Sequence, residues 1–180
     1  MVPFAYFDRL PAASKRTYRK SDRIARVELP DVARLMPLAS AIAPPLQAAS
    51  VAGVREACQR LVDELNRQLE TPPVIVKVLE RRPANSEYEL QGLYEPDEVT
   101  GGTARITVWM RTAKKENVVK FRTFLRTLLH EVCHHLDYAH LRLADSYHTQ
   151  GFFQRESSLF HQLVKSDEAK APGAGRGTGA

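Results

Sequence analysis

The sequence has few cysteines and no long run of apolar residues. Cys58 and Cys133 are its only cysteines, which is too few for the disulfide framework of a small secreted scaffold. We therefore expect two free thiols. The longest apolar stretches are a few residues long, so no membrane-spanning helix and no membrane partner are expected. The first residues lack the basic-then-apolar order of a signal peptide, and the expected compartment is the cytoplasm.

The composition is that of a globular chain. Hydrophobic residues make up 43% and charged residues 26% of the 180 residues, and this length suits one domain with its own core. We expect that domain at 31–165, preceded by a basic N-terminal arm at 1–30. The segment 166–180 is rich in Gly and Ala. Because few of its side chains offset the entropy of ordering, it is predicted to be disordered.

Positive charge is concentrated near the N-terminus. The formal net charge is +5, and residues 1–26 carry seven Lys or Arg against Asp8 and Asp22. Such an arm can dock on nucleic acid by releasing counterions, and it can equally be a solvated terminus. Nucleic acid is therefore one candidate partner. The basic residues are Arg9, Lys15, Arg16, Arg19, Lys20, Arg23 and Arg26.

Histidine is absent from the first 129 residues and is then frequent. Imidazole is the commonest metal ligand in proteins, so histidines clustered in the sequence indicate a metal site. The six histidines are His130, His134, His135, His140, His148 and His161.

The spacing of apolar residues predicts three helices. Apolar residues recur at three- and four-residue steps over 46–69 and again from Asn117, a predicted N-cap, to about Leu143. This spacing is typical of helices with one buried face. After a break near Ser146, a last helix is predicted at 150–164.

Three strand-like runs lie between the two long helices. They cover 74–79, 88–94 and 105–110 and are separated by turn residues, which predicts an antiparallel meander. If 105–110 lies beside a cleft, an extended peptide can add to its edge. The expected fold class is α+β, with a small antiparallel sheet packed on the second long helix.

That helix contains the motif His130-Glu131-Val132-Cys133-His134. Residues four apart project from the same helix face, so both imidazoles can bind one Zn²⁺ at about 2.0–2.1 Å. Glu131, on the flank of that face, is predicted to reach a water bound to the metal. Cys133 is expected to be a small core residue.

A catalytic zinc takes three protein ligands, so a third must follow His134. His140 has the spacing of the HExxHxxGxxH pattern, but Asp137 stands where that pattern has glycine. Glu156 is an alternative, as a carboxylate on a helix that folds back. Asp137 suits a carboxylate that holds an imidazole N–H better than it suits a ligand.

His148 is the preferred third ligand. A helix that stops near Leu143 overshoots His134 by about 13 Å, and a few extended residues cover a similar distance on the way back. Glu156 and His140 remain alternatives.

The chain here resembles the SprT-like zinc metallopeptidases. In that family an HExxH helix is followed by a third His that opens another helix, with an aromatic residue four positions later. His130, His134 and His148 match the histidines, and Phe152 matches the aromatic position. The resemblance covers about residues 117–164 and the strand before them. Thr149 stands where the family usually has glycine, and the chain has no Cys-x-x-Cys pair for a zinc ribbon.

The resemblance implies a zincin-like fold and a Zn²⁺-dependent hydrolase that cleaves a protein or peptide substrate. It implies His130, His134 and His148 as ligands and Glu131 as general base. The base would take a proton from the metal-activated water and deliver it to the leaving amine. Tyr147, beside the third histidine, is a candidate for stabilising the oxyanion, although packing is the commoner role of such a residue.

Two other functions are compatible with the sequence. One is a catalytically silent metal-binding or adaptor module that keeps the framework for recognition, although such a module has no need of Glu131. The other is a nucleic-acid-associated protein with a structural zinc, for which the supply of cysteine is poor.

Overall fold

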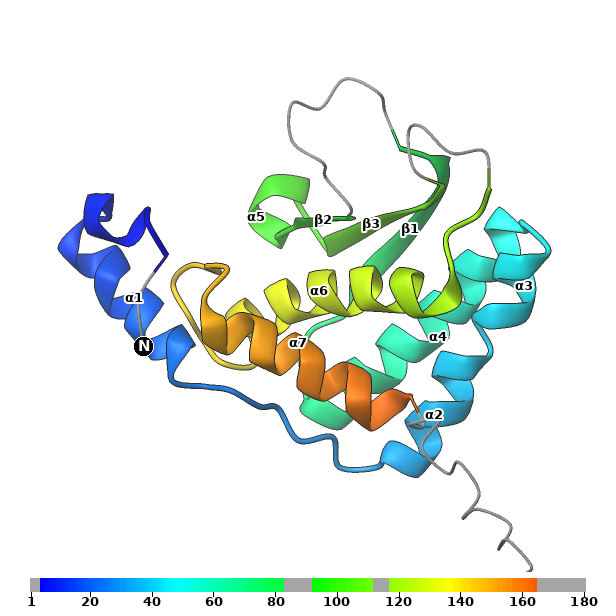
Figure 1. The fold of residues 1–180 in the computed structure, drawn as a ribbon, viewed down its shortest axis with the longest axis horizontal. Coiled ribbons are helices and arrows are strands. Elements are labelled where there is room, and N and C mark those ends of the chain that lie inside the picture. The colour runs from blue at the N-terminus through cyan, green and yellow to red at the C-terminus, as the bar shows by residue number, and fades with distance from the viewer. Residues whose placement is uncertain (1–3, 83–91, 112–116, 165–180) are drawn as a thin grey trace, which may run out of the picture.

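Strand β3 (Ala104–Arg111) is the centre of a three-stranded sheet in the computed structural model, which describes residues 4–82, 92–111 and 117–164. The strand order is β1-β3-β2, where β1 is Val74–Arg81 and β2 is Gly92–Glu95 (Figure 1). β1 runs parallel to β3 and β2 runs antiparallel to it. Ile106 of β3 lies opposite Val76 of β1 and Tyr94 of β2, which sets the register.

The predicted antiparallel meander is wrong, because β1 and β3 are parallel neighbours. The three strands do alternate in direction along the chain, but β3 inserts between the first two. Burial explains this order. Ile106, Thr107 and Val108 are consecutive and all buried, so both faces of β3 are covered and its backbone groups need partners on both edges. In β1, Ile75 is exposed between the buried Val74 and Val76, as suits an edge strand.

The helix predicted at 46–69 is two helices, α3 (Ala43–Gln47) and α4 (Val51–Leu69). Ala49 has a φ of 52°, a left-handed conformation that ends α3. Ser50 caps α4, since its hydroxyl accepts a hydrogen bond of 3.2 Å from the N–H of Gly53.

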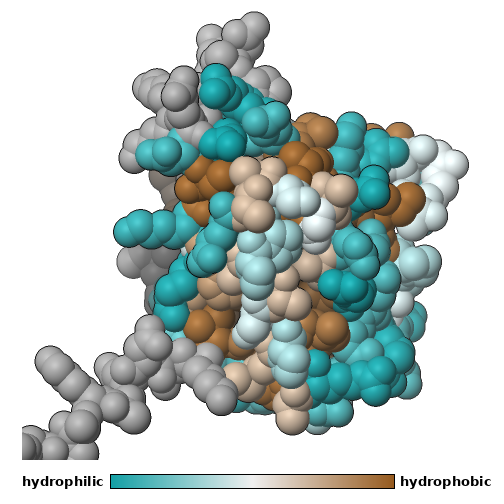
Figure 2. Space-filling view, turned by 90° about the vertical axis from the view of Figure 1, so that its right-hand side faces the viewer, coloured by the Kyte–Doolittle hydropathy of each residue, from teal (hydrophilic) through white to brown (hydrophobic). Residues whose placement is uncertain are grey.

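On the face of the molecule shown in Figure 2, hydrophilic and hydrophobic residues are interspersed.

The second long helix is confirmed as α6 (Phe121–Ala139), but it is shorter than predicted at both ends. Asn117 does not cap it. Lys120 precedes the first turn, and Val118 instead forms a β-bridge with Arg111. The last helix, α7 (Gln150–Leu163), matches its prediction closely and is capped by the side chain of Thr149.

Helices α4 and α6 pack against the sheet, and α7 packs against α6 (Figure 1). Helix α2 (Val32–Ser40) lies against α4 and α7 and completes the same apolar core. The fold is therefore a mixed α and β structure with a small sheet. Two short helices remain, α5 (Asp97–Thr100) beside β3 and the 3-10 helix η1 (Phe7–Arg9).

The segment predicted as a basic arm, 1–30, contains helix α1 (Ala12–Asp22). Tyr18 and Ser21 of this helix are buried, and α1 packs against α7. The charged groups of Lys15 and Arg19 lie 5.5 and 5.2 Å from the ring centroid of Phe7. No helix within the described ranges has the length and apolar character needed to cross a bilayer. The tail predicted at 166–180 lies outside those ranges.

Candidate metal centre

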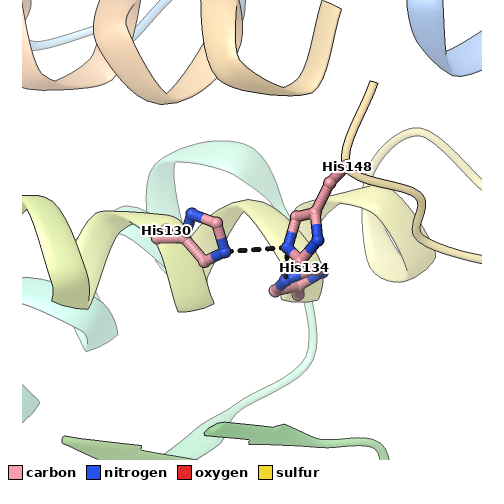
Figure 3. A group of neighbouring side chains, drawn as sticks. All are labelled: His130, His134 and His148. Carbon is pink, nitrogen blue, oxygen red and sulfur yellow. Dashed lines mark hydrogen bonds between the residues drawn. The ribbon is translucent and has the colours of Figure 1, made fainter. Parts of the chain in front are cut away.

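Three histidines meet on one side of α6 (Figure 3). His130 and His134 project from the helix one turn apart, and His148 reaches them from the loop between α6 and α7. Nε2 of His148 lies 2.9 Å from Nε2 of His130 and 3.0 Å from Nε2 of His134. One nitrogen from each ring lies within 4.8 Å of the others. The structure thus brings together the three residues that the sequence predicted as metal ligands.

The loop returns to the helix because its turn is held by backbone hydrogen bonds. Helix α6 ends at Ala139 rather than near Leu143, which shortens the distance that the loop must cover to His148. Arg142 adopts a φ of 51°, and the N–H of the buried Leu143 then donates to the carbonyl of Asp137 at 2.8 Å. The turn directs residues 144–148 back along the helix.

Hydrogen bonds on the far side of the rings orient two of the histidines. Nδ1 of His130 lies 3.0 Å from Oε2 of Glu156, and Nδ1 of His134 lies 2.7 Å from Oγ of Ser146. The Ser146 hydroxyl donates to Oδ2 of Asp137 at 2.8 Å, so it accepts from His134. Both imidazoles therefore have an N–H at Nδ1, and in a neutral ring of this tautomer the Nε2 lone pair is free to bind a metal.

The structure also shows where Glu156, Asp137 and His140 lie relative to the three histidines. Glu156 holds the back of His130 rather than adding a fourth donor to the cluster. Asp137 accepts a hydrogen bond from Ser146, which in turn accepts one from His134. The sequence had predicted that Asp137 itself would hold an imidazole N–H. His140 points elsewhere, since its Nδ1 lies 3.2 Å from the carbonyl oxygen of Leu69.

A buried arginine supports this arrangement. Arg155 of α7 is 1% exposed and donates to Oδ1 of Asp137 at 2.7 Å and to the carbonyl of Ser21 at 2.7 Å. Burial raises the pKa of Asp137, while Arg155 and Ser146 act in the opposite direction. Sequence reasoning missed both Ser146 and Arg155. The signal for Arg155 was its position in the apolar stripe of the predicted last helix, between Phe152 and Leu159.

The Nε2 nitrogens of the three histidines are better placed to bind a metal ion than to form hydrogen bonds with one another. An imidazole nitrogen that carries hydrogen has no ring lone pair left to accept. Nε2 of His148 therefore cannot donate to one neighbour and accept from the other, although it lies within hydrogen-bond distance of both. Two nitrogens bound tetrahedrally to one zinc ion would lie roughly 3.4 Å apart, a few tenths of an ångström from the observed separations.

Glu131 lies in the same cleft as the histidines, in a cavity of about 740 Å³. Its side chain is buried against Gly92 of β2, where an added Cβ would lie 2.3 Å from Oε1. Burial raises the pKa of Glu131 to about 7, and a hydrogen bond with the backbone of Tyr94 opposes this shift. Burial also lowers the pKa of His134 to about 3, with help from the positive charge of neighbouring imidazoles, so its ring is neutral.

Other predicted or neighbouring residues occupy different places. Tyr147 packs near Tyr18, with ring centroids 6.0 Å apart, and does not line the cavity, whereas Tyr94 and Tyr138 do. Cys133 is buried in the apolar core and carries a free thiol. Strand β3 is paired on both edges, so it has no free edge to which a peptide could add. The strand beside the cleft is β2.

Comparisons of the chain with protein-family models, with curated proteins and with solved structures find no match.

Proposed function

We propose that the protein is a zinc-dependent peptidase similar to the SprT-like metallopeptidases. One observation carries the proposal: three imidazole Nε2 atoms converge in a cleft that also contains the carboxylate of Glu131. Three imidazole ligands and one carboxylate base are a residue set used in zinc-assisted hydrolysis of a peptide bond.

His130, His134 and His148 would hold the zinc ion. Neutral imidazoles suit zinc, and the hydrogen bonds of Glu156 and Ser146 keep two of the rings in the required tautomer. When bound, zinc polarises the scissile carbonyl and lowers the pKa of a coordinated water. Glu131 would accept the proton of that water and pass it to the leaving amine. Its contacts with Gly92 and Tyr94 restrict the directions in which the carboxylate can point.

An extended peptide is the substrate that the cleft suits best. Gly92, Leu93 and Tyr94 of β2 line it, and within the described residues β2 pairs only with β3. A peptide could therefore add to the free edge of β2 through main-chain hydrogen bonds, which recognise no particular side chain.

The test measures bound metal and peptide cleavage in the same preparations. Purified protein should contain about one zinc ion per chain and cleave casein or a peptide library. A chelator should abolish cleavage and added zinc should restore it. Glu131→Gln should keep the metal and lose cleavage by at least about 10²-fold, whereas Glu56→Gln on the exposed side of α4 should retain both.

Two outcomes would contradict the proposal. Protein that binds zinc but cleaves nothing, with or without Glu131, would indicate a silent metal-binding module. Cleavage that survives chelation and the Glu131→Gln change would place the activity elsewhere.

A further inference from the structure

The cleft extends beyond the histidines along one face of α6. Its lining includes every fourth residue of the helix from Arg122 to Tyr138, with His130 at the midpoint. At the helical rise, these residues span about 24 Å, the length of about seven residues of an extended peptide. The groove is therefore long enough to contact a peptide on both sides of the three histidines.

The two ends of the groove differ in chemistry. At one end Tyr138 stacks on Tyr94, with ring centroids 5.9 Å apart. At the other end the guanidinium carbons of Arg122 and Arg126 lie 5.0 and 4.3 Å from the ring centroid of Phe160. One end is aromatic and the other is cationic.

Phe160 holds the two guanidinium groups at the groove wall. Its side chain is buried and comes from α7, so it is a fixed platform for both cations. Arg126 also donates to Oε1 of Glu156 at 3.1 Å, and that carboxylate is shared with His130. Arg122 is exposed and, within the described ranges, has no ion-pair partner. The cationic end thus has donors available to an incoming anion.

We propose that Arg122 and Arg126 form a carboxylate-binding subsite of the cleft. Its ligand is a peptide that carries an acidic side chain, or its own C-terminal carboxylate, at the arginine end. This inference rests on the proposed function in that it takes a peptide as the substrate. Arg126 lies about 6 Å and Arg122 about 12 Å along the helix from His130, so the carboxylate belongs about two to four residues from the bond that is cleaved.

The test uses the Glu131→Gln protein, so that binding is measured without cleavage. Three fluorescent peptides of the same length are compared by anisotropy: one with Glu at the chosen position and an amidated end, one with Gln there and an amidated end, and one with Gln and a free C-terminus. The Glu is moved through each position in turn. Tighter binding of the first peptide identifies an acidic side chain as the ligand, and tighter binding of the third identifies the terminal carboxylate.

Substitution of the arginines then tests the site itself. Arg122→Gln should reduce the preference for the acidic peptide by about twofold to fivefold, as expected for an exposed ion pair. Arg122→Lys should keep part of that preference, and removal of both arginines should abolish it. Arg60→Gln removes a similar charge from α4, away from the cleft, and should leave the preference intact. The preference should also weaken in high salt.

The outcomes separate this site from the proposed function. Equal binding of acidic and neutral peptides, or an acidic preference unchanged by Arg122→Gln, would overturn the subsite even if the wild type cleaves peptides. Charge-selective binding that depends on Arg122 would support it even if no cleavage is found. Displacement of the acidic peptide by single-stranded DNA, with DNA binding lost in Arg122→Gln, would overturn a carboxylate site in favour of a phosphate site.

Discussion

The hydroxyl of Ser146 lies between Nδ1 of His134 and Oδ2 of Asp137, at 2.7 Å and 2.8 Å. It accepts from the imidazole and donates to the carboxylate, and the other oxygen of Asp137 is held by Arg155. A continuous hydrogen-bonded chain therefore runs from the histidine cluster to a buried cation on α7. The chain fixes the tautomer of His134 and the direction of its Nε2 lone pair.

Ser146→Ala should weaken metal binding by about 10-fold to 100-fold, because it removes the partner that orients His134. Metal affinity is measured by competition with a chromophoric chelator. Ser157→Ala, on the same protein but outside the cluster, should bind metal as the wild type does. Unchanged affinity in Ser146→Ala would show that the helix alone orients the imidazole.

Arg155→Met should destabilise the fold by about 3–5 kcal/mol, because it leaves the carboxylate of Asp137 buried without its cationic partner. The free energy of unfolding is measured by urea denaturation with metal removed. Asp137→Asn combined with Arg155→Met should cost less than the sum of the two single changes, since the double variant leaves no unpaired charge. Additive losses would show that the two residues are energetically independent.

Gly92→Ala should impair catalysis while leaving the metal bound. An added Cβ would lie 2.3 Å from Oε1 of Glu131, so the carboxylate must move away from its place beside the histidines. We expect a loss of peptide cleavage of about 10²-fold for displacement of a general base, with zinc content unchanged. Gly102→Ala is the matched control, since a Cβ there has nothing within 4 Å. Full activity in Gly92→Ala would contradict the assigned position of the base.

Glu64 should make stability depend on pH in acid. The carboxylate accepts hydrogen bonds from Arg67 and Gln68 and pairs with Arg34 of α2 at 2.9 Å. The pKa of Glu64 is lowered from 4.5 to about 2, and the hydrogen bond from Arg67 is the largest cause of this shift. Since the pKa is lower in the folded state, the stabilisation is fully present above 4.5 and disappears as the pH falls towards 2.

This dependence is isolated by comparing the wild type with Glu64→Gln. The difference between their free energies of unfolding should be constant from pH 7 to about 5 and should shrink at lower pH. Glu56→Gln, at an exposed position of α4, serves as the control for removal of a carboxylate. A difference that stays constant down to pH 2 would exclude the linkage.

Much of the fold could be predicted from local patterns, and the failures are non-local. The apolar repeats located α6 and α7 because a helix buries one face at a fixed period. The order β1-β3-β2 could not be predicted. The neighbours of a strand depend on which strand has both of its faces buried in the core, and this is decided by packing rather than by the local sequence pattern. The break before α4 rests on one left-handed residue, Ala49, which the apolar periodicity does not reveal.

The sequence by itself determined that His130 and His134 share a helix face with Glu131 beside them, because the backbone geometry of a helix converts a spacing of four residues into adjacency. Only the tertiary structure decided that His148 completes the cluster while Glu156 holds the back of His130. It also decided that Ser146 and Arg155 support His134 and Asp137. These contacts join residues from a helix, a loop and a second helix, and their distances depend on how the whole core packs.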